Sequence, residues 1–128
     1  MASGIPAIEL RMMRRNTTAF IAADDRQITL TRTPRLNNGT GGTRPGTPTP
    51  LPTQTLRLLP QAESTSTERT LPDGRVVKPT WVLLGDYTAD MLRGDTFPLP
   101  DGTTGEVVYV HEKRDYEVKG EVISRGPH

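Results

Sequence analysis

Residues 81–123 read WVLLGDYTADMLRGDTFPLPDGTTGEVVYVHEKRDYEVKGEVI, a succession of short strand-like runs separated by turn residues. Valine and tyrosine fill much of residues 107–110, and apolar or small residues alternate with charged ones over residues 116–122. Alternation with a period of two is typical of strands that bury one face and expose the other. Leu99-Pro100-Asp101-Gly102 combines a proline that presets a bend with a glycine that accepts a positive φ angle. The segment is therefore predicted to be a meander, in which residues 96–99 fold back onto residues 105–110.

The size and composition favour a single small domain spanning residues 1–128. Apolar residues make up 33% of the chain, and twelve glycines with twelve prolines predict many turns and loops. No apolar run approaches the roughly 20 residues that cross a bilayer, and no secretion signal is recognisable at the N-terminus. Without cysteine, the chain has no disulfide, thiol nucleophile or thiolate metal site. We expect a soluble, unexported protein.

The net charge of +1 hides an asymmetry between the two halves of the chain. Residues 1–60 carry a net charge of +5, whereas residues 61–128 carry −4. Such a split suits nucleic-acid binding, and it also suits subunits that stack or form rings through opposite faces. Two solvated faces that simply differ in charge are an equally good interpretation.

One helix is predicted, over residues 6–23. Pro6 is tolerated in a first helical turn, and residues 16–18 are a weak point at which the helix ends or bends. A stripe of residues recurs at spacings of three and four, as in an amphipathic helix. It consists of Ile8, Met12, Arg15, Ala19 and Ala22.

Strand-like and loop-like segments alternate in the middle of the chain. Residues 27–33 and 54–59 alternate between apolar and polar, and residues 76–84 form a further strand in which Pro79 marks an edge or a change of pairing partner. Residues 37–52 are a long protruding loop in which Gly, Pro and Thr supply twelve of sixteen residues. Residues 61–75 form a second polar loop.

These elements predict a mainly β fold, a small closed or partly open antiparallel β-barrel of about six strands with an N-terminal α-helix and two long loops. A split sandwich is the alternative. The predicted strands are residues 27–33, 54–59, 76–84, 96–99, 105–110 and 116–123.

Residues suited to catalysis are sparse. His111 is expected to lie in a turn or on the surface, and His128 is the last residue. Asp86 and Asp95 each follow a glycine; they are interpreted as turn residues that bond their own backbone, the alternative being carboxylates aimed at a common point. We therefore expect no enzyme and no catalytic, cofactor-binding or metal-binding residues.

The order of the segments resembles the head-to-tail stopper, or head closure, proteins of long-tailed actinobacterial phages. The resemblance covers nearly the whole chain. It is carried by RMMRRNTTAFIAADD, ITLTR, the Gly/Thr/Pro loop, QTLRLLPQ, LPDGRVVKPTWVLLGDYTADMLRGDTFPLPDG and VVYVHEKRDYEVKGEV. The chain departs from the expected pattern at Gly105 and Gly120, which stand where strand side chains are usual.

The resemblance implies a structural virion protein of the phage neck, present as a ring of six or twelve copies. Such a ring lies between the portal and adaptor complex on one side and the tail terminator or tail tube on the other. It helps to retain the packaged double-stranded DNA, which it meets without sequence reading, and it offers the docking surface for the tail. A tail terminator or another neck connector is the nearest alternative, and a nucleic-acid-binding small β-barrel is the alternative of another class.

Three sets of contact residues are predicted. The first, in a loop that contacts partners or closes the channel, is Asn37, Thr40, Arg44, Thr47, Thr49 and Leu51. The second, in the other loop, is Glu63, Glu68 and Arg69. The third, Arg11, Arg14 and Arg15 on the helix, is predicted to meet a neighbouring subunit or a DNA backbone.

Overall fold

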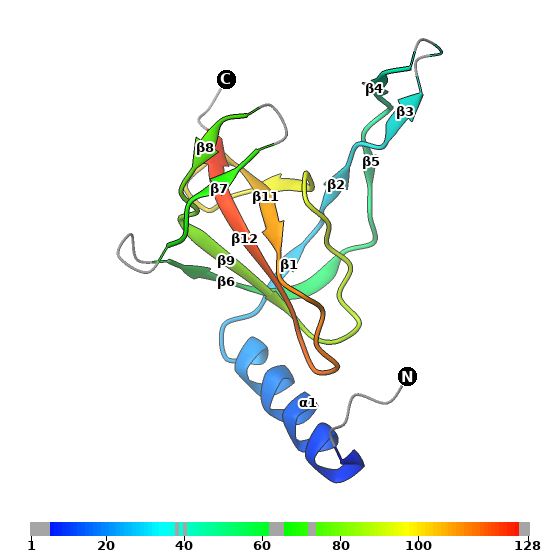
Figure 1. Ribbon diagram of the computed structural model, residues 1–128. Coiled ribbons are helices and arrows are strands. Elements are labelled where there is room, and N and C mark those ends of the chain that lie inside the picture. Colours follow the sequence, from blue (N-terminus) through cyan, green and yellow to red (C-terminus); the bar gives the residue numbers. More distant parts are fainter. Residues whose placement is uncertain (1–5, 38, 40, 62–65, 72–73, 126–128) are drawn as a thin grey trace.

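The computed structural model describes residues 6–37, 39, 41–61, 66–71 and 74–125. It confirms a mainly β fold with an N-terminal helix (Figure 1). The helix, α1, spans Ala7–Ala22. The strands are β1 (Arg26–Ile28), β2 (Thr31–Arg32), β3 (Arg35–Asn37), β4 (Thr43–Pro45), β5 (Thr49–Pro50), β6 (Gln54–Pro60), β7 (Arg69–Thr70), β8 (Val76–Val77), β9 (Trp81–Gly85), β10 (Thr96–Pro98), β11 (Thr104–Val110) and β12 (Val118–Arg125).

Eight strands form one curled antiparallel sheet in the order β1-β6-β9-β12-β11-β10-β2-β5. The sheet is an open half-barrel, so the prediction of about six strands and of possible closure is wrong. The predicted strand 27–33 is interrupted after Ile28 and contributes β1 and β2 separately. A further strand, β5, comes from a segment that was predicted to be loop.

The half-barrel stays open along a seam between β1 and the end of β10. A cavity of about 170 Å³ there is lined by Arg26, Gln27 and Ile28 on one side and by residues 97–100 on the other. Pro98 and Pro100 have no N–H group with which to extend the ladder of hydrogen bonds toward β1. The proline content of this turn therefore explains why the two sides do not join.

The core is divided between the two faces of the sheet. The main cluster includes Leu30, Leu56, Leu83, Val107 and Val122, all of them fully or almost fully buried. A second cluster of Leu71, Val108 and Ile123 lies on the opposite face, because neighbouring strand residues point to opposite sides. The small β7–β8 sheet contributes to this second cluster through Val77.

Three strand glycines are explained by close packing. A Cβ atom at Gly105 would lie 3.0 Å from Cζ of Phe97, and one at Gly120 would lie 2.9 Å from Sδ of Met91. At Gly85 it would lie only 2.3 Å from Cβ of Ala89. The two departures from the expected strand pattern thus leave the pairing of β11 with β10 and β12 intact.

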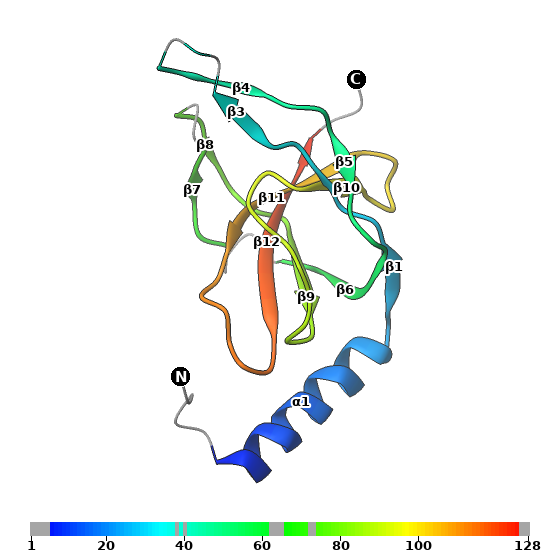
Figure 2. The same cartoon turned by 90° about the vertical axis from the view of Figure 1, so that its right-hand side faces the viewer.

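Residues 26–56 form one long two-stranded ribbon. Arg26 pairs with Leu56, Arg32 with Thr49 and Arg35 with Pro45, so the register slips by one residue twice along its length. Each slip adds a residue to the second arm, which increases the local twist. The outer part, residues 34–46, projects beyond the half-barrel at the end opposite α1 (Figures 1 and 2), and we call it the ribbon tip. The predicted loop 37–52 is therefore largely a paired ribbon that contains β4 and β5.

The second predicted loop, residues 61–75, also contains a strand. Arg69 and Thr70 of β7 pair with Val77 and Val76 of β8. The predicted strand 76–84 is consequently two strands, β8 and β9, separated at the buried Pro79. Its carbonyl oxygen accepts a hydrogen bond of 2.6 Å from Oγ of Ser66.

The first and last residues of the two Leu-Pro-Asp-Gly sequences make matching hydrogen bonds. The N–H of Gly102 donates to the carbonyl of Leu99 at 3.1 Å, and that of Gly74 donates to the carbonyl of Leu71 at 2.9 Å. Gly102 and Gly74 have φ angles of 86° and 89°, a conformation that L side chains rarely adopt. The predicted hairpin of β10 and β11 is confirmed, with Phe97 opposite Gly105.

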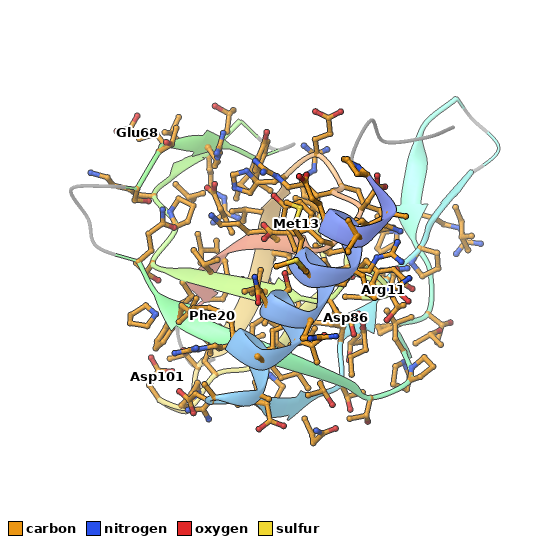
Figure 3. All side chains as sticks on the ribbon, turned by 90° about the horizontal axis from the view of Figure 1, so that it is seen from below. Arg11, Met13, Phe20, Glu68, Asp86 and Asp101 are labelled. Atoms are coloured by element: carbon orange, nitrogen blue, oxygen red, sulfur yellow. The ribbon has the colours of Figure 1, made fainter. Side chains whose placement is uncertain are left out.

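The helix α1 lies across the end of the half-barrel opposite the ribbon tip, as Figure 3 shows from below. It buries Thr17 and Ile21, and Leu10 and Met13 are half-buried. The heptad-like stripe predicted from the sequence faces the other way: Ile8 is 67% exposed and Met12 is 56% exposed. No helix in the described part of the chain is long and apolar enough to span a membrane.

Candidate interaction surfaces

The ribbon tip carries Asn37 and Arg44 of the first predicted contact set, and Thr47, Thr49 and Leu51 follow it along the second arm of the ribbon. Arg44 is exposed and lies opposite Leu36, which is 40% exposed. Thr47 and Thr49 are exposed, and Oγ1 of Thr49 donates to the carbonyl of Thr47. Asn37 ends β3, while Thr40 lies outside the described residues. Leu51 is different, because it is half-buried and packs against the main core.

A buried ion pair holds the ribbon to the half-barrel. Nε and Nη2 of Arg32 donate to the two carboxylate oxygens of Asp95 at 2.9 and 2.8 Å. Asp95 is 1% exposed and also accepts a hydrogen bond of 2.8 Å from the N–H of Leu92. Asp90, more exposed, lies 3.1 Å from the same guanidinium. We call these residues the ribbon clasp.

The clasp corrects the interpretation of Asp95 as a simple turn residue. Its bond to Leu92 is local, as predicted, but its main partner is Arg32, 63 residues away in sequence. Hydrogen bonding to Asp95 raises the pKa of Arg32 above its ordinary value despite partial burial, so the guanidinium is charged at any physiological pH. Asp86 matches the prediction, because its carboxylate accepts from the N–H of Thr88.

A second buried carboxylate lies on the outer face of the sheet. Glu121 is 4% exposed and accepts from Nε and Nη2 of Arg69 at 2.9 and 2.8 Å. Nε2 of His111 lies 2.7 Å from Oε2 of Glu121, so this histidine is more than a surface residue. The guanidinium of Arg69 also lies 3.7 Å from the ring centroid of Tyr109. Hydrogen bonding to Arg69 lowers the pKa of Glu121 against the opposing effect of burial.

In this cluster Arg69, which was predicted to contact a partner, has an ion-pair partner within the chain. Its guanidinium pairs with the carboxylate of Glu121 and thereby links β7 to β12. Glu68 is exposed next to it, and Glu63 lies outside the described residues. Alternation over residues 116–122 placed Glu121 among exposed positions, so only its pairing with Arg69 reveals why a carboxylate is tolerated there.

The three helix arginines, Arg11, Arg14 and Arg15, differ in their contacts within the chain. Nε of Arg14 donates to the carbonyl of Asp115 at 2.9 Å, and its guanidinium lies 3.8 Å from the ring centroid of Tyr87. Arg14 therefore attaches the helix to the half-barrel. Arg11, labelled in Figure 3, and Arg15 are both exposed.

The exposed stripe of α1 is an apolar surface that the described residues of the chain leave largely uncovered. Ile8, Met12, Ala19 and Ala22 are all exposed, and Arg15 interrupts them. At the C-terminal end of the helix, Phe20 is 47% exposed and lies under the guanidinium of Arg57 at 4.1 Å. A groove of about 360 Å³ beside it is lined by apolar residues such as Leu59 and Val82. Clustered exposed apolar side chains of this kind are typical of interaction surfaces.

Within the described ranges, no group of three or more histidines or carboxylates is placed to hold a metal ion. No family model matches the chain, and no curated protein matches it in sequence.

Proposed function

We propose that this chain is a structural subunit of a phage neck, a head-to-tail stopper that assembles as a ring between the portal complex and the tail. The observation that carries the proposal is the ribbon tip, a paired projection in which no residue of described burial is buried. Hydrogen bonds between β3 and β4 order its backbone, and Arg44 and Leu36 on it are exposed. A projection of this kind contributes little packing to an isolated domain. Where several subunits meet, it can contact its neighbours.

The ribbon is built to contact partners through side chains instead of by adding strands. Pro34, Pro45, Pro48, Pro50 and Pro52 are distributed along its two arms. Each proline lacks the N–H group that pairing with a further strand would require, which is a common protection of exposed edges. In a ring, such ribbons approach one another or the tail without fusing into an aggregated sheet.

The opposite end of the molecule supplies a second contact surface. The exposed stripe on α1 and the ribbon tip lie at opposite ends (Figures 1 and 2). A subunit placed between a head complex and a tail needs two separate docking surfaces of this kind. We assign the helix stripe to one neighbour and the ribbon tip to the other.

The proposal is tested by shortening the ribbon in the phage that encodes the chain. Residues 36–44 are replaced by Asn-Gly, which leaves Arg35 opposite Pro45 next to a two-residue turn. We expect normal folding and DNA-filled heads, with loss of tail attachment or leakage of DNA, measured by electron microscopy and by sensitivity of the DNA to nuclease. The single substitution Arg44→Ala is expected to cause a weaker defect of the same kind.

The position of the chain in the phage particle tests the proposal independently of the ribbon variants. Cryo-electron microscopy of purified particles is expected to place the chain in the neck, on the head side of the tail terminator. Absence of the protein from particles would overturn the proposal, as would a position at the tail end of the neck, which identifies a terminator. Normal tail attachment and DNA retention with the shortened ribbon would overturn the role of the ribbon.

Polar substitutions on the helix stripe are expected to impair assembly into particles without destabilising the folded chain. Because Ile8 and Met12 are exposed, Ile8→Gln with Met12→Gln should change the free energy of unfolding by less than about 0.5 kcal/mol. Incorporation into particles should fall by about 30-fold or more, which corresponds to roughly 2 kcal/mol of lost contact. Urea unfolding and quantitative immunoblotting of purified particles measure the two effects.

The buried Ile21 provides the control for this experiment. Ile21→Gln places a polar side chain at a position that is 4% exposed and is expected to destabilise the monomer itself. If the exposed double variant enters particles as well as the unchanged protein does, the stripe is not a docking surface.

A further inference from the structure

The open seam of the half-barrel leaves one edge of β1 without a partner strand. In the described part of the chain β1 pairs only with β6, and no backbone hydrogen bond joins residues 26–29 to residues 97–100 across the seam. The ladder between the two sides ends at Thr31 and Thr96, where β2 meets β10. An unpaired edge presents backbone N–H and C=O groups to any extended chain that reaches it.

Prolines on the β10 side prevent the ladder from continuing across the seam. The N–H of Leu99 donates to the carbonyl of Thr103 at 2.8 Å, on the side of β11. Neighbouring residues of a strand direct their N–H groups to opposite sides, so the residues before and after Leu99 face β1. These residues are Pro98 and Pro100, which have no N–H group to donate. The seam is therefore kept open by the sequence of this turn.

The backbone of β1 directs its free groups into the seam. The carbonyl of Leu30 accepts from the N–H of Leu51 at 2.8 Å, so the backbone groups of Leu30 face the second arm of the ribbon. Ile28 and Leu30 are both buried, which indicates that the strand alternation continues through Thr29. The backbone groups of Gln27 and Thr29 therefore face the other way, toward the seam.

An apolar cavity lies beside this free edge. Its volume is about 170 Å³, and four of its lining residues are buried and apolar, namely Ile28, Leu58, Phe97 and Leu99. An apolar cavity of about 150 Å³ holds a molecule of benzene, so this space accommodates one large apolar side chain. A free strand edge next to a pocket for a side chain is the arrangement by which proteins bind extended segments as added strands.

We propose that the seam is an acceptor site for an extended segment of another protein, which pairs with β1 and places one large apolar side chain in the cavity. In this mode of binding the main-chain hydrogen bonds supply affinity, and the pocket supplies specificity. Arg26 lines the cavity, is exposed, and has no ion-pair partner among the described residues, and no carboxylate lines the cavity. We therefore expect the segment to carry an acidic residue next to the apolar one.

A second copy of this chain is a poor source of the segment. Its own β1 carries the exposed Arg26 and Gln27 and the buried Ile28, so it has no free apolar side chain to place in the cavity. The strand at the other edge of the sheet, β5, contains Pro50, which lacks an N–H group. The occupant is therefore a different protein chain. The seam binds such a segment whether or not the chain belongs to a phage neck.

The test selects ligands for the isolated full chain from a library of random peptides of about ten residues, the upper length of an ordinary strand. We expect the enriched peptides to share one large apolar residue beside an aspartate or glutamate, within an alternating pattern. Binding of such a peptide should slow amide hydrogen exchange at Gln27 and Thr29, measured by nuclear magnetic resonance. Methylation of alternate backbone nitrogens of the peptide should weaken binding by about tenfold or more, because it removes hydrogen bonds to β1.

Variants of the seam and matched controls locate the bound peptide. Leu58→Phe fills the cavity and is expected to weaken binding by about 30-fold, the loss typical of a removed anchor contact. Val82→Phe enlarges a side chain in the groove beside α1 and should leave the affinity unchanged. Arg26→Glu changes an exposed position, so folding is preserved, and should weaken binding by about tenfold. Arg93→Glu is the exposed control for this reversal of charge and should have no effect.

Four results would overturn the proposal. The first is failure to enrich any peptide. The second is equal affinity of the selected peptides for the unchanged chain, Leu58→Phe and Arg26→Glu, which places binding elsewhere. The third is insensitivity to methylation at every backbone nitrogen, which excludes strand pairing. The fourth is self-association of the chain that Arg26→Glu abolishes, which makes a second copy the occupant.

The proposed function can fail while this site stands. A chain that is absent from phage particles but binds peptides in the seam would refute the neck assignment alone. A chain located in the neck whose seam binds no peptide would do the reverse.

Discussion

Asp95→Ala is expected to lower the free energy of unfolding by about 3–5 kcal/mol, the range seen when one partner of a buried ion pair is removed. The substitution leaves the guanidinium of Arg32 with only the exposed Asp90, and it leaves the N–H of Leu92 without its carboxylate acceptor. Urea unfolding followed by circular dichroism measures the loss. Because Arg32 belongs to β2, we also expect faster amide hydrogen exchange over β2 and β5 at denaturant concentrations well below the midpoint.

Asp90→Ala is the matched control. It removes a carboxylate from the same arginine, but the Asp90 side chain is 60% exposed, so the loss should stay below about 1 kcal/mol. If the two alanine variants are equally stable, the clasp contributes no more than a surface ion pair.

Glu121→Ala is expected to cost about 3–5 kcal/mol as well, because it leaves Arg69 without its bidentate partner on the outer face of the sheet. The milder Glu121→Gln tests the charge alone through the pH dependence of stability. The pKa of Glu121 is lowered in the folded protein, so its stabilising contribution is fully present above the ordinary value of 4.5 and is lost as the pH falls through the lower folded value. The unchanged protein should therefore lose stability below about pH 4.5 more steeply than Glu121→Gln does.

Glu112→Ala provides the control for the pH experiment, because Glu112 is an exposed acid in the nearby turn. Its unfolding free energy should stay within about 0.5 kcal/mol of that of the unchanged protein, with an unaltered pH profile. If Glu121→Gln and the unchanged protein give parallel profiles between pH 3 and 5, Glu121 does not contribute through its charge.

The meander of residues 81–123 could be predicted because its signals are local. Strand alternation and the Leu99–Gly102 turn each depend on residues that are neighbours in sequence. The ribbon tip could not be recognised as strand from its sequence. Apolar and polar residues alternate only where one face of a strand is buried, and the residues of β3 and β4 whose burial is described are exposed. Its Gly, Pro and Thr residues therefore suggested a loop, although its backbone is paired.

The candidate surfaces were harder to predict, because they depend on long-range contacts. The spacing of the residues from Ile8 to Ala22 defines one face of a helix, but it does not say whether that face packs on the barrel or points away. Likewise, the sequence does not show that Arg14 contacts the carbonyl of Asp115 and that Arg69 pairs with Glu121 within the chain.

The continuity of the ribbon with both ends of the sheet has a mechanical consequence. One arm contributes β1 and β2, and the other contributes β5 and β6, so the ribbon joins the two ends of the sheet across the open seam. The Arg32–Asp95 ion pair attaches it to the half-barrel at one point. We expect a load applied to the tip by a bound partner to act on the width of the seam, with this ion pair as the fixed point.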